Sequence, residues 1–302
     1  FSPVARSFER SAMDIEPLTA VRQTTPGTRM ILLIASVLVF LVGIQLFVLT
    51  EMTDRFFAWT IKSRLTAAFL GAAYWASCTM EFVASRRRVW AHARIAIPAV
   101  LVFTAVTLVI SLVHIDLFHL DEPSVMTRFF TWTWLFVYAV VPPVMVVLLV
   151  RQVRAAGVDL PRQGRLPVWF RVLLGVHAAA LIPMGIALLL TPKVAAELWP
   201  WTLTPLTGRA IGAWLLGLGI AATQAVVEND WIRIRPATMS YTAFAVLEFA
   251  ALARYPDELA WETPSAWIYL VLLASALVIG LYGWWQATQL RKKIDADGSV
   301  PA

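Results

Sequence analysis

Eight long apolar runs constrain this chain more than any other feature of its sequence. Each run is about 20 residues long, which in a helix rising 1.5 Å per residue is enough to cross roughly 30 Å of hydrocarbon. Because the runs are continuously apolar and do not alternate, they predict helices rather than membrane β-strands. The predicted spans lie near residues 30–50, 65–84, 95–115, 128–150, 168–190, 206–227, 237–254 and 266–289. The sequence therefore predicts an all-α integral membrane protein with eight transmembrane helices.

The charged residues are few and unevenly placed. They make up 15% of the 302 residues, against about a quarter in soluble domains, and the mean hydropathy is +0.71. Of the 25 Lys and Arg residues, 18 fall in segments 1–29, 85–94, 151–171, 228–235 and 290–302. This bias predicts a bacterial cytoplasmic membrane protein with both termini cytoplasmic. The net charge of +6 then reflects topology and contact with anionic lipid on the cytoplasmic face, and nucleic acid is not expected as a partner.

An internal repeat is indicated when the sequence is compared with itself at an offset of 141 residues. The matches are rare residue types at predicted helix ends: Pro26 with Pro167, Thr50 with Thr191, Trp90 with Trp231, Arg94 with Arg235, Asp116 with Asp257, and Pro123-Ser124 with Pro264-Ser265. Four spans per copy is an even number, so both copies enter from the same side. We therefore expect two parallel four-helix repeats related by a pseudo-two-fold axis along the membrane normal.

This repeat divides the chain into four parts. Residues 30–154 form the first predicted four-helix repeat, residues 155–295 the second, and residues 296–302 a C-terminal tail. Residues 1–29 form a cytoplasmic N-terminal arm whose weakly apolar face predicts an interfacial or docking helix, the alternative being a solvated tail. The chain begins at Phe1, which indicates processing or truncation, and the single cysteine, Cys78, cannot form a disulfide within one chain.

Small residues at four-residue spacing mark the predicted second and sixth helices. Helices in lipid associate where small side chains let their backbones approach closely. The packing residues expected on this basis are Ala68, Ala72, Gly208, Gly212 and Gly217. We expect these two helices to lie at the centre of the molecule.

Ionisable residues inside the membrane are candidates for function because each is costly there. Glu248 lies about 12 residues into the predicted seventh helix, roughly 18 Å from its cytoplasmic start. It is either a proton, cation or ligand site, with Arg209 and His177 as conceivable partners, or a protonated carboxyl that hydrogen-bonds for packing. Glu81 lies nearer the cytoplasmic end of its helix, where pairing with Arg86–Arg88 is expected to satisfy it.

Fourteen tryptophans are explained most simply as belts at the two membrane interfaces. An alternative is an aromatic-lined outer cavity for a lipophilic or cationic ligand. Such a cavity would form where the segments of Trp59 and Trp201 face one another across the pseudo-axis.

The predicted architecture resembles that of haem A synthase, which also has eight helices in two parallel four-helix units. That family needs histidines that recur between the units. In this chain the counterparts of His92, His114, His119 and His177 at the 141 offset are Arg233, Tyr255, Ala260 and Ser36. The resemblance therefore implies no haem, and the sequence assigns no cofactor and no metal site.

Two functions are consistent with this sequence. Motifs for phosphate loops, zinc hydrolases and serine nucleophiles are absent from it, so an enzyme is not favoured. The first function is a non-catalytic accessory or scaffold subunit that packs against another membrane protein. The alternative is a transporter or binder of a small lipophilic or cationic solute, held between the two repeats.

Overall fold

The computed structural model describes residues 21–296, and residues 1–20 and 297–302 lie outside that description. Most of the predicted N-terminal arm therefore falls outside the described residues. In chain order the helices are α2 (Pro26–Gly43, continued by a wider turn to Val48), α3 (Thr53–Phe56), α4 (Arg64–Ser85), α5 (Trp90–Ala93), α6 (Ala96–Val113), α7 (Val125–Val153), α8 (Val168–Leu190), α9 (Pro192–Ala195), α10 (Pro205–Glu228), α11 (Trp231–Arg254) and α12 (Pro264–Ala296).

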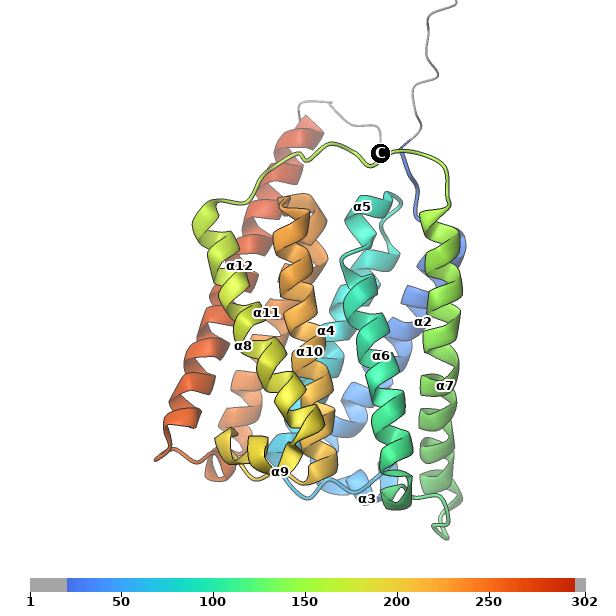
Figure 1. The fold of residues 1–302 in the computed structure, drawn as a ribbon, viewed down its shortest axis with the longest axis vertical. Coiled ribbons are helices and arrows are strands. Elements are labelled where there is room, and N and C mark those ends of the chain that lie inside the picture. Colours follow the sequence, from blue (N-terminus) through green and yellow to red (C-terminus); the bar gives the residue numbers. More distant parts are fainter. Residues whose placement is uncertain (1–20, 297–302) are drawn as a thin grey trace, which may run out of the picture.

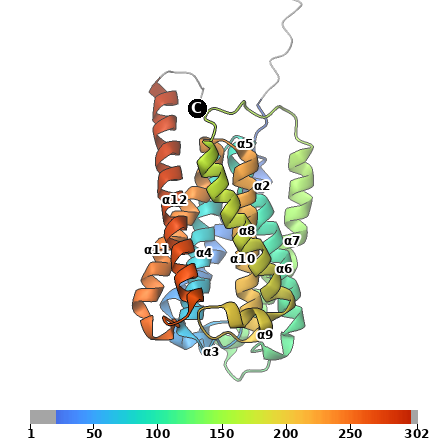
Figure 2. The same cartoon turned by 60° about the vertical axis from the view of Figure 1, so that its left-hand side comes forward.

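The long helices run side by side along the bundle, and the short ones lie at its ends (Figures 1 and 2). Helix α5 lies at the same end as both ends of the described chain, and α3 and α9 lie at the opposite end. We refer to these as the inner end, which holds residues 21 and 296, and the outer end.

Residues with hydroxyl or carboxylate side chains cap the N-termini of several long helices. Thr25, Ser63, Ser124 and Thr204 each accept a hydrogen bond from the backbone N–H three residues on, which satisfies a donor that the first turn leaves free. Asp230 does the same for α11, which begins at Trp231, six residues before the predicted span.

Six helices in the described part of the chain are long and apolar enough to cross a membrane: α2 with its continuation, α6, α7, α8, α10 and α12. They indicate a polytopic integral membrane protein. Helices α4 and α11 are less apolar, and most of their side chains are buried inside the bundle. The two helices pack against each other, and the Ser240 hydroxyl of α11 donates to the Ala76 carbonyl of α4 at 2.8 Å.

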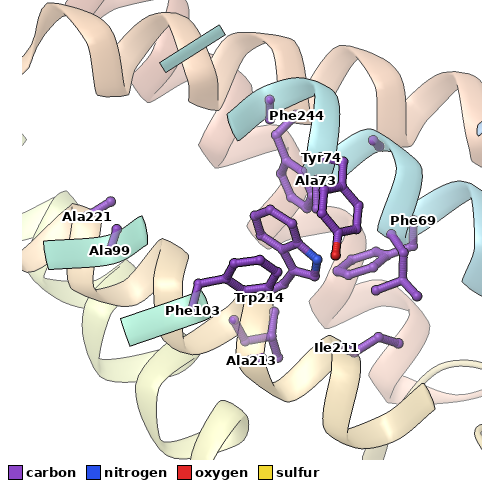
Figure 3. Close-up of a cluster of buried hydrophobic side chains, with 14 of the residues drawn as sticks. Phe69, Ala73, Tyr74, Ala99, Phe103, Ile211, Ala213, Trp214, Ala221 and Phe244 are labelled. Carbon is purple, nitrogen blue, oxygen red and sulfur yellow. The ribbon is translucent and has the colours of Figure 1, made fainter. Parts of the chain in front are cut away.

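Aromatic side chains fill the centre of the bundle, as Figure 3 shows. The rings of Trp214 and Phe103 lie 3.9 Å apart, and the Tyr74 ring lies 4.8 Å from Trp214. The Tyr74 hydroxyl also hydrogen-bonds the Tyr138 hydroxyl at 2.7 Å. This cluster ties α4, α6, α7 and α10 together.

Candidate functional site

The principal cavity of the described structure lies between α8, α10, α11 and α12 and has a volume of about 620 Å³. This is within the range of small-molecule sites, which are mostly apolar with a few polar groups. Aliphatic side chains such as Leu181, Met184 and Leu272 cover much of its wall. The aromatic part of the wall comprises Phe69, Trp199, Tyr241, Phe244 and Tyr269.

The cavity opens toward the outer end and toward the lipid-facing surface. Ile268 and Leu198 line it and are 61% and 64% exposed. Helices α8 and α12 diverge toward this end (Figures 1 and 2), and the cavity lies between them. Along α12 it extends from Pro264 to Ala276, roughly 18 Å at the helical rise. A ligand could therefore enter from the apolar surface of the bundle near its outer end.

Two hydrogen-bonded pairs supply polarity at the cavity wall. The Tyr269 hydroxyl donates to Glu248 Oε2 at 2.7 Å, and His177 Nε2 lies 2.8 Å from the Ser275 hydroxyl. Tyr269 and His177 line the cavity, whereas Glu248 lies behind Tyr269 and is fully buried. The second carboxylate oxygen of Glu248 has no hydrogen-bond partner among the described residues, so the carboxyl acts on the cavity through Tyr269.

The mouth of the cavity carries a negative charge. Glu197, an exposed residue between α9 and Trp199, is the one carboxylate among the residues that line the described cavity. Aromatic faces and a carboxylate both attract cations. The arrangement therefore suits an apolar molecule that carries a positive or hydrogen-bonding group.

The predicted site residues fall into two groups. Glu248 and His177 meet the cavity as described, and Trp201 lies against its wall, with its ring 5.0 Å from Trp199 and 5.4 Å from Tyr269. Trp201 also donates to the Thr66 hydroxyl of α4 at 2.9 Å. Glu248, His177 and Trp201 therefore all lie at or next to the wall of this cavity.

Arg209 and Trp59 lie elsewhere. Arg209 donates to the Leu189 carbonyl at 3.0 Å, and its Nη1 lies 2.6 Å from His114 Nε2, so it contacts neither Glu248 nor His177. The Trp59 ring packs 5.0 Å from Trp134 in the first half of the chain. Trp59 and Trp201 therefore do not share the cavity.

Aromatic side chains occupy the part of the first half that the 141-residue offset aligns with the cavity. At the 141 offset the counterpart of Ser275 is Trp134. The Trp134 indole packs between Phe57 and Trp59 and donates to Ser111 at 3.0 Å. The cavity beside these rings has a volume of about 10 Å³, room for about one water molecule. The Trp134 indole and its aromatic neighbours thus leave almost no free volume in this part of the bundle.

The residues that sequence reasoning missed are Tyr269, Ser275 and Trp199. An embedded carboxyl needs a hydrogen-bond donor. Tyr269 could have been found on this basis, because it is one of six tyrosines in the chain and lies in an apolar run.

The contacts of Glu81 differ from those that the sequence predicts. It is buried and accepts a hydrogen bond from Ser77 at 2.9 Å, and among the described residues it forms no ion pair with Arg86–Arg88.

The predicted packing residues are all buried. A Cβ atom on Gly212 would lie 2.8 Å from the Gly185 carbonyl oxygen of α8, and one on Gly217 would meet Phe103 at 3.7 Å. Gly208 lies near Pro192 and Leu188. Helices α8 and α10 thus approach each other most closely at Gly185 and Gly212. The predicted residues of α4, Ala68 and Ala72, are fully buried.

Comparison with known proteins adds no functional evidence. No protein-family model, no curated protein and no solved structure matches this chain.

Proposed function

We propose that the protein binds a lipophilic cation in the cavity between α8 and α12, taking it from the outer half of the bilayer. The cavity of about 620 Å³ is the observation that carries this proposal. Its aliphatic and aromatic wall suits the apolar body of such a ligand. The Tyr269 hydroxyl, held by Glu248 at 2.7 Å, and the Glu197 carboxylate supply the polar contacts.

The site belongs to a molecule that we propose has eight spans. Helices α4 and α11 are 22 and 24 residues long, roughly 33 and 36 Å at the helical rise, which is enough to cross the bilayer. Their lower hydropathy is consistent with their central position, because a helix surrounded by other helices does not need an apolar surface toward lipid.

The proposed arrangement is two parallel four-helix repeats. At the 141 offset, α2, α4, α6 and α7 correspond to α8, α10, α11 and α12. Helix pairs that are in contact in one half have equivalents that are in contact in the other half. Pairs α2–α4 and α8–α10 correspond, as do α6–α7 and α11–α12, and the contacts between halves, α4–α11 and α6–α10, also correspond. The solute site lies within the second repeat, with Phe69 of α4 as a contribution from the first.

We place the inner end in the cytoplasm of a bacterial cell. The described loops of the inner end carry the arginines of segments 85–94, 151–171 and 228–235, whereas the outer end is rich in carboxylates. The positive-inside rule supports this orientation. It puts the mouth of the cavity on the outer side of the membrane.

The accessory-subunit role and a membrane-protein partner stay predictions. The docking arm that favoured them falls mostly outside the described residues. The cavity is the more specific observation, because a scaffold has no need of a hydrogen-bonded polar pair at the wall of an internal space.

Binding of tetraphenylphosphonium to the purified protein in detergent tests the proposal. Ala180 lines the cavity, whereas its neighbour Ala179 is exposed. The variant A180W should place an indole in the cavity and weaken binding at least about tenfold, while the matched variant A179W should bind like the wild type. The variant E248Q should weaken binding up to about tenfold, because Tyr269 loses its carboxyl acceptor.

Tetraphenylborate, an anion of the same shape, is the control for charge. It should bind more weakly than the cation, since Glu197 and the aromatic faces favour positive charge. Equal binding of the cation by A180W and A179W would remove the cavity as the binding site.

A further inference from the structure

A cluster of three arginines lies at the inner end, far from the cavity, and two of them have no anionic partner among the described residues. It comprises Arg87 in the turn after α4, Arg235 in the second turn of α11, and Arg291 near the end of α12. The Nε atoms of Arg87 and Arg235 are buried and lack a hydrogen-bond partner among the described residues. Buried guanidinium groups normally have an anionic or carbonyl partner, because an unpaired buried charge is costly.

The positive charges of this cluster act on one another. Burial, followed by the charges of Arg235 and Arg291, lowers the pKa of Arg87 to about 10. Burial and then Arg87 lower the pKa of the neighbouring His92 to about 4. Two described carboxylates at this end of the bundle already have other partners. Asp230 accepts four backbone N–H bonds, and Asp295 lies 3.8 Å from Arg291 at the exposed surface.

The place that the proposed repeat relates to this cluster shows what is missing. There Arg94 donates two hydrogen bonds to Glu228, at 2.5 and 2.8 Å, and Arg233 donates to the same carboxylate at 3.1 Å. At the 141 offset, Arg94 corresponds to Arg235, Arg233 to His92, and Glu228 to Arg87. An arginine therefore stands where the carboxylate would be, and the Nε atoms of Arg87 and Arg235 are left without an anion among the described residues.

We propose that Arg87, Arg235 and Arg291 form a binding site for a phosphate-type oxyanion. A planar guanidinium matches phosphate oxygens with paired N–H donors. One phosphate group bound by two guanidinium groups would therefore take the role that the Glu228 carboxylate has between Arg94 and Arg233. The phosphate can come from an anionic lipid headgroup of the inner leaflet or from a free phosphate. The site is independent of the cavity, so either proposal can fail alone.

Thermal unfolding of the purified full chain in a phosphate-free detergent tests this site. Inorganic phosphate, titrated against chloride at constant ionic strength, should raise the midpoint, because a ligand that binds the native state stabilises it. Phosphatidylglycerol and phosphatidylcholine, added to the same micelles, form the second arm. A rise with phosphatidylglycerol alone assigns the site to a lipid headgroup, and a rise with inorganic phosphate assigns it to a soluble anion.

Three variants decide whether the arginines are responsible. R87E rebuilds the carboxylate of the other half, so it should raise the midpoint without added anion and abolish the response to anion. R235Q should weaken the apparent affinity for the anion about 10- to 100-fold. This variant tests the site even if R87E does not fold. R88Q, which alters the exposed neighbour, should respond like the wild type.

Two results would overturn the proposal. One is a wild-type midpoint that neither inorganic phosphate nor phosphatidylglycerol raises above its chloride or phosphatidylcholine control, as expected if a carboxylate outside residues 21–296 already pairs with the cluster. The other is an anion response in R235Q that equals that of R88Q.

Discussion

The carboxylate of Glu258 joins the two halves of the bundle at the outer end. It accepts hydrogen bonds from the Ser63 hydroxyl at 2.6 Å, from the backbone N–H of Arg64 and Leu65 at 3.1 and 3.0 Å, and from Arg64 Nε at 2.8 Å. These donors form the first turn of α4, where the helix dipole also favours a negative charge. One side chain of the second half thus caps a central helix of the first.

The variant E258Q should be less stable than the wild type by about 1–3 kcal/mol at pH 7, the usual cost of losing hydrogen bonds to a charged group. Burial acts to raise the pKa of Glu258, but the hydrogen bonds from Ser63, Leu65 and Arg64 outweigh it and lower that pKa. The stabilisation is therefore complete above the unfolded value of about 4.3 and is lost as the pH falls through the lower folded value.

Unfolding free energies measured in micelles between pH 7 and pH 3 check this expectation. The difference between wild type and E258Q should shrink in the acid range. E262Q, which changes an exposed carboxylate four residues away, is the matched control. A pH-independent difference between wild type and E258Q would show that the charge of Glu258 does not cap α4.

At the level of single residues, the sequence could predict which groups are unusual but not what they contact. Glu248 stands out because an embedded carboxyl is costly, and so does His177. Their partners, Tyr269 and Ser275, both lie on α12, whose rotation and tilt relative to α8 and α11 are set by packing. The wrong expectation for Glu81 has the same origin, because the side chain is buried and its one hydrogen bond among the described residues comes from Ser77, one turn away.

At the level of helices, the contact between α8 and α10 depends on two glycines. A Cβ atom on Gly185 would lie 2.8 Å from the Gly212 carbonyl oxygen, and one on Gly212 would lie 2.8 Å from the Gly185 carbonyl oxygen. Separations this short require the backbones to move apart. In a membrane this contact is a main source of helix association, because apolar burial contributes little there.

G212A should therefore destabilise the protein by about 1–3 kcal/mol, the usual cost of overpacking. G217A on the same helix is the control, because its new Cβ would make ordinary contacts at 3.7 Å with Phe103 and 3.8 Å with Ala99. Both changes gain the same helix propensity, so their difference isolates the steric effect. Equal stability of the two variants, measured by thermal unfolding in one detergent, would count against the close contact.

The helices themselves were the most predictable part of the fold. Continuous apolar runs located each long helix, because a segment of about 20 apolar residues has few alternatives in lipid. Helix ends were less predictable. The predicted seventh span begins at residue 237, whereas α11 begins at Trp231 because Asp230 caps it. The first turns of α11 contain charged residues, so a hydropathy pattern does not detect this start.

At the level of the whole molecule, the two halves are held together at both ends. Glu258 and Arg64 join them at the outer end, and Arg94 and Glu228 at the inner end. Between these ends the central aromatic cluster joins the two halves, and the cavity opens beside it, between α8 and α12. The sequence could not predict where a cavity would open, because that depends on how α8 and α12 pack against α10 and α11.

The proposed topology predicts which loops face the outside. In a cysteine-free background made with C78A, single cysteines at Glu122 and Glu262 should react with a membrane-impermeant maleimide in intact cells. Cysteines at Ala156 and Asp295 should react only after the cells are opened. All four positions are exposed, so accessibility depends on the side of the membrane. Reaction of positions 122 and 156 from the same side would contradict an α7 that spans the membrane.

The measurement that tests the binding site most directly is an experimental structure of the protein with tetraphenylphosphonium bound. The ligand should lie between α8 and α12, with its rings against the wall that includes Tyr269 and Tyr241 and with His177 at its inner limit. Binding at saturating concentration with density at the aromatic cluster of the first half, or at any place other than this cavity, would contradict the account.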